Sequence, residues 1–257
     1  MLVRVCSIEV HAHSGSRTLA ARELDQMTQD KQTTNEHDLN VRIPADSIKL
    51  EGELKAPSSA TGIVLFAHGS GSSRHSPRNQ YVASVIRNAG VGTLLFDLLT
   101  LEEEAIDIQT RHLRFDIDLL ARRLVDATNW IKQEPALRHL RVGYFGSSTG
   151  GGAALVAAAM VGEEIGAVVS RGGRPDLAAE ALPRVKSPTL LIVGGYDEPV
   201  IKLNKHAYAQ LRCQKKLEIV PGATHLFEEP GKLEEVARLA AEWFQKYLRP
   251  RSVGARN

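Results

Sequence analysis

The apolar residues of this chain fall into short continuous runs, separated by longer segments in which they recur at helical spacing. A strand covered by helices on both faces is apolar throughout, so the runs predict buried strands. We expect strands at residues 40–43, 48–55, 63–67, 92–96, 141–145, 167–170, 189–193 and 217–220. Helices are expected at residues 79–88, 111–133, 148–160, 176–182, 201–211 and 231–248. The alternation predicts an α/β fold with a mostly parallel sheet of about eight strands and helices on both faces.

Three segments add detail to this outline. The first two expected strands are joined by the short turn 44–47, which predicts an antiparallel pair. Residues 170–189 hold at most one helix and two loops, so no large lid is expected and the pocket should be shallow and open. The longest expected helix carries its apolar residues at core spacing: Phe115, Leu119, Leu120, Leu124 and Ala127.

The strand at residues 141–145 runs directly into Gly146-Ser147-Ser148-Thr149-Gly150, which opens an Ala-rich helix. A sharp strand-to-helix turn forces its central residue into a strained backbone conformation and exposes that side chain, and the flanking glycines avoid collisions. Ser148 then stands at a helix N-terminus, where N–H groups and the dipole favour developing negative charge. The pattern predicts a nucleophilic serine, and the alternative is a flexible loop of small residues.

A serine nucleophile needs a base, and the base needs an acid that fixes its tautomer. His225 follows the last expected strand, and Asp197 follows the strand before it, in the chain order Ser, Asp, His that this turn predicts. Asp176 is the alternative acid, although its place at an expected helix start is typical of a capping residue. Asp97 precedes the nucleophile and is expected to anchor a loop. Six other histidines fall in the first residues of the chain, on expected helices or in loops: His11, His13, His37, His112, His139 and His206.

The strand at residues 63–67 ends in His68-Gly69-Ser70-Gly71. A Gly-rich turn at this place supplies one backbone N–H of an oxyanion hole, and the residue after the nucleophile supplies the other. We therefore expect the N–H groups of Ser70 and Thr149 to form the oxyanion hole.

With these motifs the chain resembles the α/β-hydrolase superfamily, and within it small lidless esterases of the dienelactone hydrolase type. The resemblance runs from about residue 39 to about residue 248. It implies an α/β-hydrolase domain at residues 37–257, preceded by an irregular N-terminal extension, residues 1–36, that is either a simple extension or a docking arm. It also implies a structural role for His68. Dienelactone hydrolases use a cysteine nucleophile, and this chain has serine in its place.

Two pairs of arginines should border the cleft. Arg74 and Arg78 follow the oxyanion turn, and Arg171 and Arg174 follow the expected strand 167–170. A guanidinium matches a carboxylate through two parallel hydrogen bonds, so these arginines predict a preference for carboxylate-bearing esters or lactones. Dienelactone hydrolases act on such a lactone. The alternative is that the arginines pair with acidic residues of the chain itself, namely Asp97, Asp176 or the Glu102–Glu104 cluster.

Composition narrows the function classes. The chain has 257 residues, with 32 Lys and Arg against 30 Asp and Glu, and a net charge of +2 argues against a nucleic-acid surface. No apolar run approaches the roughly 20 residues of a membrane span. Neither Cys6 nor Cys213 has a partner in a metal-binding pattern, so both are expected to be reduced, and no metal or cofactor is implied. A cytoplasmic location is the default expectation, and a homodimer stays open.

These observations predict a serine hydrolase that cleaves short-chain carboxylic esters through an acyl-enzyme on Ser148. The same residues would serve lactone hydrolysis, thioester hydrolysis or acyl transfer to peroxide. A hydrolase-like scaffold that binds a ligand without catalysis is the alternative from another class, and the presence of all three triad residues argues against it.

Overall fold

The computed structural model describes residues 37–249, and these form one sheet of eight strands with helices on both faces. The sheet order is β1-β2-β4-β3-β5-β6-β7-β8. Strands β1 and β2 form an antiparallel hairpin, β2 pairs antiparallel with β4, and all other neighbours are parallel. The strands are β1 (His37–Ala45), β2 (Ile48–Ala56), β3 (Gly62–Ala67), β4 (Gly92–Phe96), β5 (Arg141–Ser147), β6 (Ile165–Arg171), β7 (Thr189–Gly194) and β8 (Lys215–Val220). This is the α/β-hydrolase fold, as the sequence predicts.

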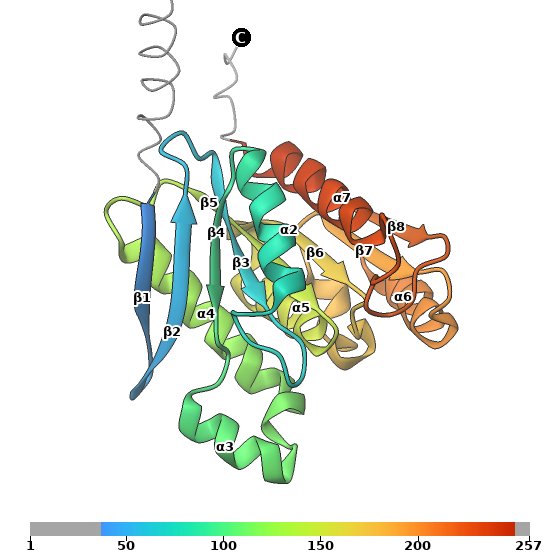
Figure 1. Ribbon diagram of the computed structural model, residues 1–257, viewed down its shortest axis with the longest axis horizontal. Helices are drawn as coiled ribbons and strands as arrows, with labels where there is room; N and C mark the ends of the chain where they lie inside the picture. Colours follow the sequence, from blue (N-terminus) through green and yellow to red (C-terminus); the bar gives the residue numbers. More distant parts are fainter. Residues whose placement is uncertain (1–36, 250–257) are drawn as a thin grey trace, which may run out of the picture. The chain divides into compact units, whose positions relative to one another are not determined.

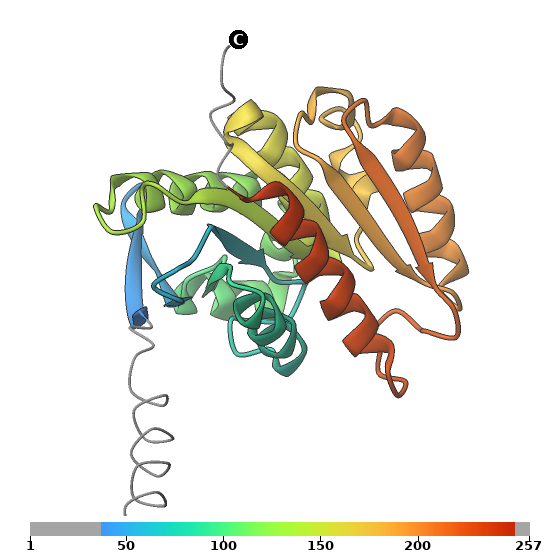
Figure 2. The same cartoon turned by 90° about the horizontal axis from the view of Figure 1, so that it is seen from above.

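Two layers of helices cover the sheet, and Figure 2 shows them on opposite sides of it. One layer packs α4, α5 and α6 against one face, and the other packs α2 and α7 against the opposite face. Strands β3 to β7 are buried along their whole length or nearly so, because helices cover both of their faces. The helices are α2 (Pro77–Asn88), α3 (Leu101–Thr110), α4 (Ile117–Gln133), α5 (Thr149–Val161), α6 (Glu198–Gln210) and α7 (Lys232–Tyr247).

The region between β4 and β5 differs from the prediction of one long helix over residues 111–133. Helix α3 begins at a capping box in which Thr100 and Glu103 bond to each other's backbone N–H groups, and it ends at Arg111 in the left-handed conformation. A separate helix, α4, starts after Asp116, whose side chain accepts from the N–H of Leu119. Figure 1 shows α3 beyond the carboxyl end of β4. Phe115, which the sequence places in the core, lies in the short 3₁₀ turn Leu113–Phe115 and is 53% exposed.

The connection from β6 to β7 also differs from the prediction. The expected helix over residues 176–182 is replaced by two 3₁₀ turns, Pro175–Ala178 and Leu182–Arg184, each of which starts at or next to a proline. A proline tolerates the first turn of a helix but interrupts the hydrogen bonding of a longer one. Among the described residues no helical lid is evident, as the sequence predicts.

Predictions for residues 1–36, which include Cys6, His11 and His13, lie outside the described residues. Between residues 37 and 249, no helix has both the length and the apolar composition needed to cross a membrane.

Candidate active site

Ser148 occupies the turn between β5 and α5 and has a strained backbone, with φ 52° and ψ −121°. The turn is tight because glycines allow backbone to approach backbone. A Cβ at Gly146 would collide with the carbonyl of Gly150, and a Cβ at Gly150 would collide with the carbonyls of Ala67 and His68. The N–H of Ser148 donates to the carbonyl of Arg171 at 3.2 Å, which ties the turn to the end of β6. The sequence pattern therefore produces the sharp strand-to-helix elbow expected at Ser148.

The predicted base and acid contact each other at the same edge of the sheet. Nδ1 of His225 lies 2.6 Å from Oδ2 of Asp197, and the Asp197 side chain is only 12% exposed. Because a carboxylate only accepts hydrogen bonds, Nδ1 carries the proton and Nε2 is left with a free lone pair. Gly172, with φ +51°, packs against His225: a Cβ there would lie 3.1 Å from the carbonyl oxygen of His225 and in ordinary contact with its ring. Since Gly172 follows Arg171, the His225–Asp197 pair lies beside the Ser148 turn.

The oxyanion turn after β3 also contacts the Ser148 turn. A Cβ on Gly69 would lie 3.1 Å from both the carbonyl oxygen of Ser147 and the Cβ of Ser148. Among residues 37–249, neither the N–H of Ser70 nor that of Thr149 has a hydrogen-bond acceptor. Both groups are therefore available to an oxygen held at Ser148, as an oxyanion hole requires.

His68 holds this turn in place through its backbone contacts. Its Nδ1–H donates to the carbonyl of Gly69, and its Nε2 accepts from the N–H of Leu98, each at 3.1 Å. Burial lowers the pKa of His68, although the charges of Asp97 and Glu104 act in the opposite sense. A neutral imidazole with one donor and one acceptor satisfies both contacts, which is a structural role, as predicted.

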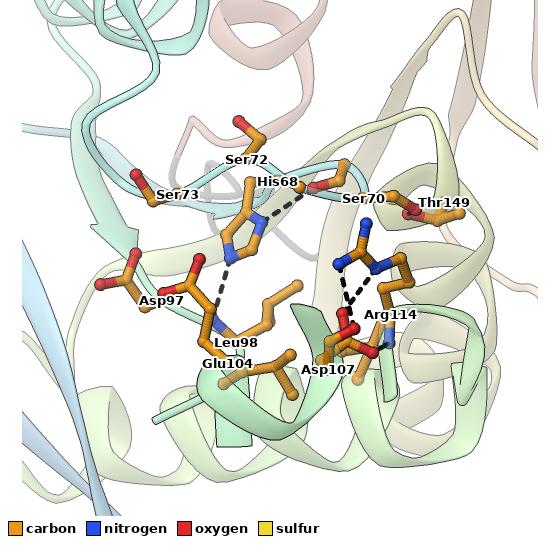
Figure 3. Close-up of a pocket in the computed structure, with 14 residues that line it drawn as sticks. His68, Ser70, Ser72, Ser73, Asp97, Leu98, Glu104, Asp107, Arg114 and Thr149 are labelled. Atoms are coloured by element: carbon orange, nitrogen blue, oxygen red, sulfur yellow. Dashed lines mark hydrogen bonds and ion pairs between the residues drawn. The ribbon is translucent and has the colours of Figure 1, made fainter. Parts of the chain in front are cut away.

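A small cavity of about 30 Å³ lies beside the turn, and Figure 3 shows the residues that line it. Its walls come from the oxyanion turn, the end of β4, helix α3 and the first residue of α5. Arg114 and Asp107 close one side: the backbone N–H of Arg114 donates to Oδ1 of Asp107 at 3.0 Å, and its Nε donates to Oδ2 at 2.5 Å. Burial alone would raise the pKa of Asp107, but the hydrogen bonds from Arg114 bring it below its usual value.

Three of the four arginines predicted to bind substrate contact acidic residues of the chain, and two of these three contact acids that the sequence offers as alternatives. Arg74 donates its backbone N–H to Asp97 at 2.7 Å and also bonds to that carboxylate through its guanidinium. Arg174 forms a bidentate pair with Asp176, at 2.8 and 2.7 Å. These contacts were the open alternative, and they agree with the loop-anchoring role expected for Asp97.

Arg171 is different, because it is buried without a carboxylate. It is 7% exposed, and within the described range its Nε and Nη1 have no hydrogen-bond partner. Burial, and secondly the charge of Arg78, lowers the pKa of Arg171 to about 10, so the guanidinium is still charged at neutral pH. Arg78 bonds to Glu228 through Nη1 at 2.8 Å, while its Nε is buried without a partner. Positive charge therefore accumulates between α2 and the end of β6, next to the Ser148 turn.

The comparison with protein-family models matches residues 54–249 to the dienelactone hydrolase family. The chain belongs to the dienelactone hydrolase family. A solved dienelactone hydrolase from Anabaena variabilis is 64% identical, with a TM-score of 0.82 over 83% of this chain and 99% of that one. Est1E from Butyrivibrio proteoclasticus, with 17% identity and a TM-score of 0.69 over 81% of this chain and 98% of its own, shares the fold. Membership of this family supports hydrolase activity.

The curated relatives carry a different name. Proteins of two Mycobacterium tuberculosis strains, each named "Putative phosphoribosyl transferase", are 56% identical over 211 residues, which is 82% of this chain and 47% of theirs. The chain thus spans about half the length of the curated relatives it matches.

Sequence reasoning missed two features of this family member's site, the Asp107–Arg114 pair and the contact between the hydroxyls of Ser70 and Thr149. The first had a detectable signal, because Thr100 and Glu103 have the spacing of a capping box and mark a helix before residue 111. The hydroxyl contact joins residues 79 positions apart in the sequence, and no local pattern predicts it. Within the described range, no group of three or more His, Cys, Asp or Glu side chains is arranged to hold a metal ion.

Proposed function

We propose that this chain is a serine hydrolase that cleaves short-chain carboxylic esters through an acyl-enzyme on Ser148. The observation that carries the proposal is the 2.6 Å contact between His225 and Asp197 beside the strained turn of Ser148. This contact leaves Nε2 of His225 as the base, beside the partly exposed residue Ser148.

The reaction then takes two steps. Oγ of Ser148 attacks the ester carbonyl while Nε2 of His225 takes its proton, and the N–H groups of Ser70 and Thr149 stabilise the oxyanion. The C–O bond to the alcohol breaks, and the alcohol leaves with the proton from His225. Water then attacks the acyl-enzyme, His225 takes a proton from that water and returns it to Ser148, and the carboxylic acid is released.

The open site supports short esters as the substrate class. Without a lid, each methylene beyond the pocket adds no further burial, which is otherwise worth about 0.8 kcal/mol. Hydrolysis of a lactone or thioester is the alternative within the same chemistry, and serine in place of the cysteine of dienelactone hydrolases is the reason to rank simple esters first.

An anionic group on the substrate is a second part of the proposal. Since Arg74 and Arg174 already contact carboxylates of the chain, the proposal rests on Arg171, with Arg78 beside it. A buried guanidinium without a partner is costly, and a substrate carboxylate would satisfy it through two parallel hydrogen bonds.

The transferase name of the curated relatives is not the function that we propose. This chain matches only 47% of those proteins, and we infer that the name describes the half that the chain does not match.

The test compares wild type with Ser148→Ala on p-nitrophenyl acetate. We expect kcat to fall by a factor of about 10⁴ or more in Ser148→Ala, because the acyl-enzyme can no longer form. Asp197→Asn should lose about as much, because the imidazole would take the wrong tautomer. Ser147→Ala, at a neighbouring serine of the same turn, is the matched control and should keep wild-type turnover.

A fluorophosphonate probe followed by peptide mass spectrometry gives the second readout, and we expect the label on Ser148. Turnover above about a tenth of wild type in Ser148→Ala, or a label on another serine, would assign the reaction to a different nucleophile. A correctly folded wild type that neither hydrolyses esters nor takes the label would be a binding scaffold.

A further inference from the structure

Helix α3 is attached to the domain through polar side chains. Its one buried residue is Asp107, whose carboxylate bonds to Arg114. Glu103 bonds to Arg123 of α4 at 2.9 Å and also closes the capping box with Thr100. Acidic side chains therefore face the domain, which reverses the usual arrangement, in which the apolar stripe of a surface helix faces the core.

The apolar residues of α3 lie on its outer surface instead. Leu101, Ala105 and Ile108 follow one another at intervals of four and three residues, so they form one stripe along the helix. Leu101 is 77% exposed, Ile108 is 64% exposed, and Ala105 between them is also exposed. Figure 1 shows α3 projecting beyond the carboxyl end of β4. Single exposed apolar side chains are normal, but a row of them along one helix indicates a docking surface.

The order of the residues in this stripe is self-complementary. When two copies of α3 lie antiparallel about a two-fold axis at Ala105, each Ala105 faces its counterpart and each Leu101 faces Ile108 of the second copy. The small side chain at the centre lets the two helices approach closely, and the larger side chains at either end pack beside it. The stripe therefore matches a second copy of itself.

The charges around the stripe also favour the antiparallel arrangement. Glu102 and Glu104, in the first turn of α3, are exposed and form no ion pair within residues 37–249. Arg111, directly after the last turn, is exposed and has no ion pair in that range either. An antiparallel pair brings each acidic first turn toward Arg111 of the second copy, whereas a parallel pair places acid beside acid. The acidic turn also disfavours the anionic surface of a membrane as the partner.

We propose that α3 is the interface of a homodimer, in which the stripe of Leu101, Ala105 and Ile108 binds the same stripe of a second copy in antiparallel orientation. The inference concerns assembly and does not depend on the proposed esterase reaction. One helix from each copy makes a small interface, so the association is weak and depends on concentration, with a dissociation constant in the micromolar range.

The experiment is sedimentation velocity of the full chain from about 1 to 200 μM, a range in which we expect the wild type to change from monomer to dimer. Ile108→Glu should weaken the association by about tenfold or more, because it places an unpaired carboxylate against Leu101 of the second copy. Leu101→Glu breaks the same contact from the other side and should have the same effect. Ile106→Glu is the matched control and should change nothing, since Ile106 is 53% exposed on the same helix but lies off the stripe.

Cysteine cross-linking tests the position of the two-fold axis. In a chain with Cys6 and Cys213 replaced by Ser, Ala105→Cys should form a disulfide between copies under mild oxidation, because a residue on the axis faces its own counterpart. Ile106→Cys is the matched control and should stay unlinked, because it points to another side of the helix. Circular dichroism verifies the fold of each variant.

Three results would overturn the antiparallel dimer. The first is a wild type that stays monomeric over the whole range of concentrations. The second is equal weakening by Ile106→Glu and Ile108→Glu, or cross-linking through Ile106→Cys and not through Ala105→Cys, which would assign the dimer to another face. The third is binding of the monomer to phosphatidylcholine vesicles that is lost in Ile108→Glu, which would identify a lipid surface as the partner.

Discussion

The two sides of the Ser148 turn both contain arginines, but these arginines have opposite surroundings. On the turn side, formed by the oxyanion turn and α3, Arg74 contacts Asp97 and Arg114 contacts Asp107. On the arginine side, between α2 and the end of β6, Arg171 is buried with another arginine as its charged neighbour. One side therefore balances its charges internally, and the other holds an unbalanced positive charge.

This difference separates residues that maintain the shape of the site from a residue that we expect to bind the substrate. A buried ion pair with complete hydrogen bonding maintains local shape, and removal of one partner is costly. A buried charge without a partner lowers stability, so its presence next to the Ser148 turn calls for a ligand that neutralises it. The turn side should therefore respond to mutation in stability, and the arginine side in substrate selection.

The largest expected effect is the loss of selectivity in Arg171→Met. With a neutral ester and its carboxylate-bearing counterpart, the ratio of kcat/KM values should fall by about 10- to 100-fold, the value of one buried charge-assisted contact. Arg78→Ala should reduce the ratio less, since Arg78 is partly neutralised by Glu228. Arg174→Met, which breaks a pair on a more exposed loop, is the matched control and should leave the ratio unchanged.

High salt should weaken the preference for the anionic substrate in wild type and have little effect in Arg171→Met. Equal kcat/KM values for both substrates in wild type, unaffected by salt or by either substitution, would contradict the proposal that the arginine side selects anionic substrates.

The next effect is on stability, and here we expect the turn side to be more sensitive to substitution than the arginine side. Asp107→Ala should lower the free energy of unfolding by about 2 kcal/mol, because it leaves the partly buried guanidinium of Arg114 without its carboxylate. Arg171→Met should leave stability unchanged or raise it, because it removes a buried charge. Urea unfolding followed by circular dichroism measures both. A greater loss in Arg171→Met than in Asp107→Ala would contradict our reading of the two sides.

The smallest effect is a pH dependence that arises on the turn side. Burial lowers the pKa of His68 in the folded chain, while the unfolded chain keeps the ordinary value of about 6.5. Below pH 6.5 the unfolded state therefore binds a proton that the folded state does not. The free energy of unfolding decreases as the pH is lowered from 6.5 to the pKa of His68 in the folded state. We expect a loss of up to about 1 kcal/mol per pH unit in this window.

His68→Gln should make the unfolding free energy less dependent on pH between 6.5 and 5, with wild type measured beside it. An identical pH dependence in the two proteins would show that His68 gains its proton equally in both states.

Much of this structure could be predicted because its signals are local. Continuous apolar runs identified the strands, and the glycines around Ser148 identified the elbow, because both depend on residues close in sequence. The break between α3 and α4 was missed because the apolar spacing around Phe115 continues through a segment whose caps, at Arg111 and Asp116, end one helix and start another.

The pairing of the arginines could not be predicted for a different reason. Each of these arginines lies near the end of an expected strand: Arg74, Arg171 and Arg174. The local sequence around them therefore does not distinguish one from another. Arg74 finds its carboxylate at the end of the neighbouring strand, whereas Arg171 finds none, and only the packing of the sheet decides between these outcomes. The alternation of β6 directs Arg171 to the same face as Val169, toward α2 and α7.

The close approach of Gly150 to Ala67 and His68 also has a consequence for how the chain folds. The elbow closes only against the end of β3, and the parallel pairing of β3 with β5 joins segments separated by most of the first half of the domain. Such pairings form late, because a long loop must close before any contact rewards it. A refolding chain should therefore regain helical circular dichroism before it regains hydrolysis, and the delay measures the time needed to bring the centre of the sheet together.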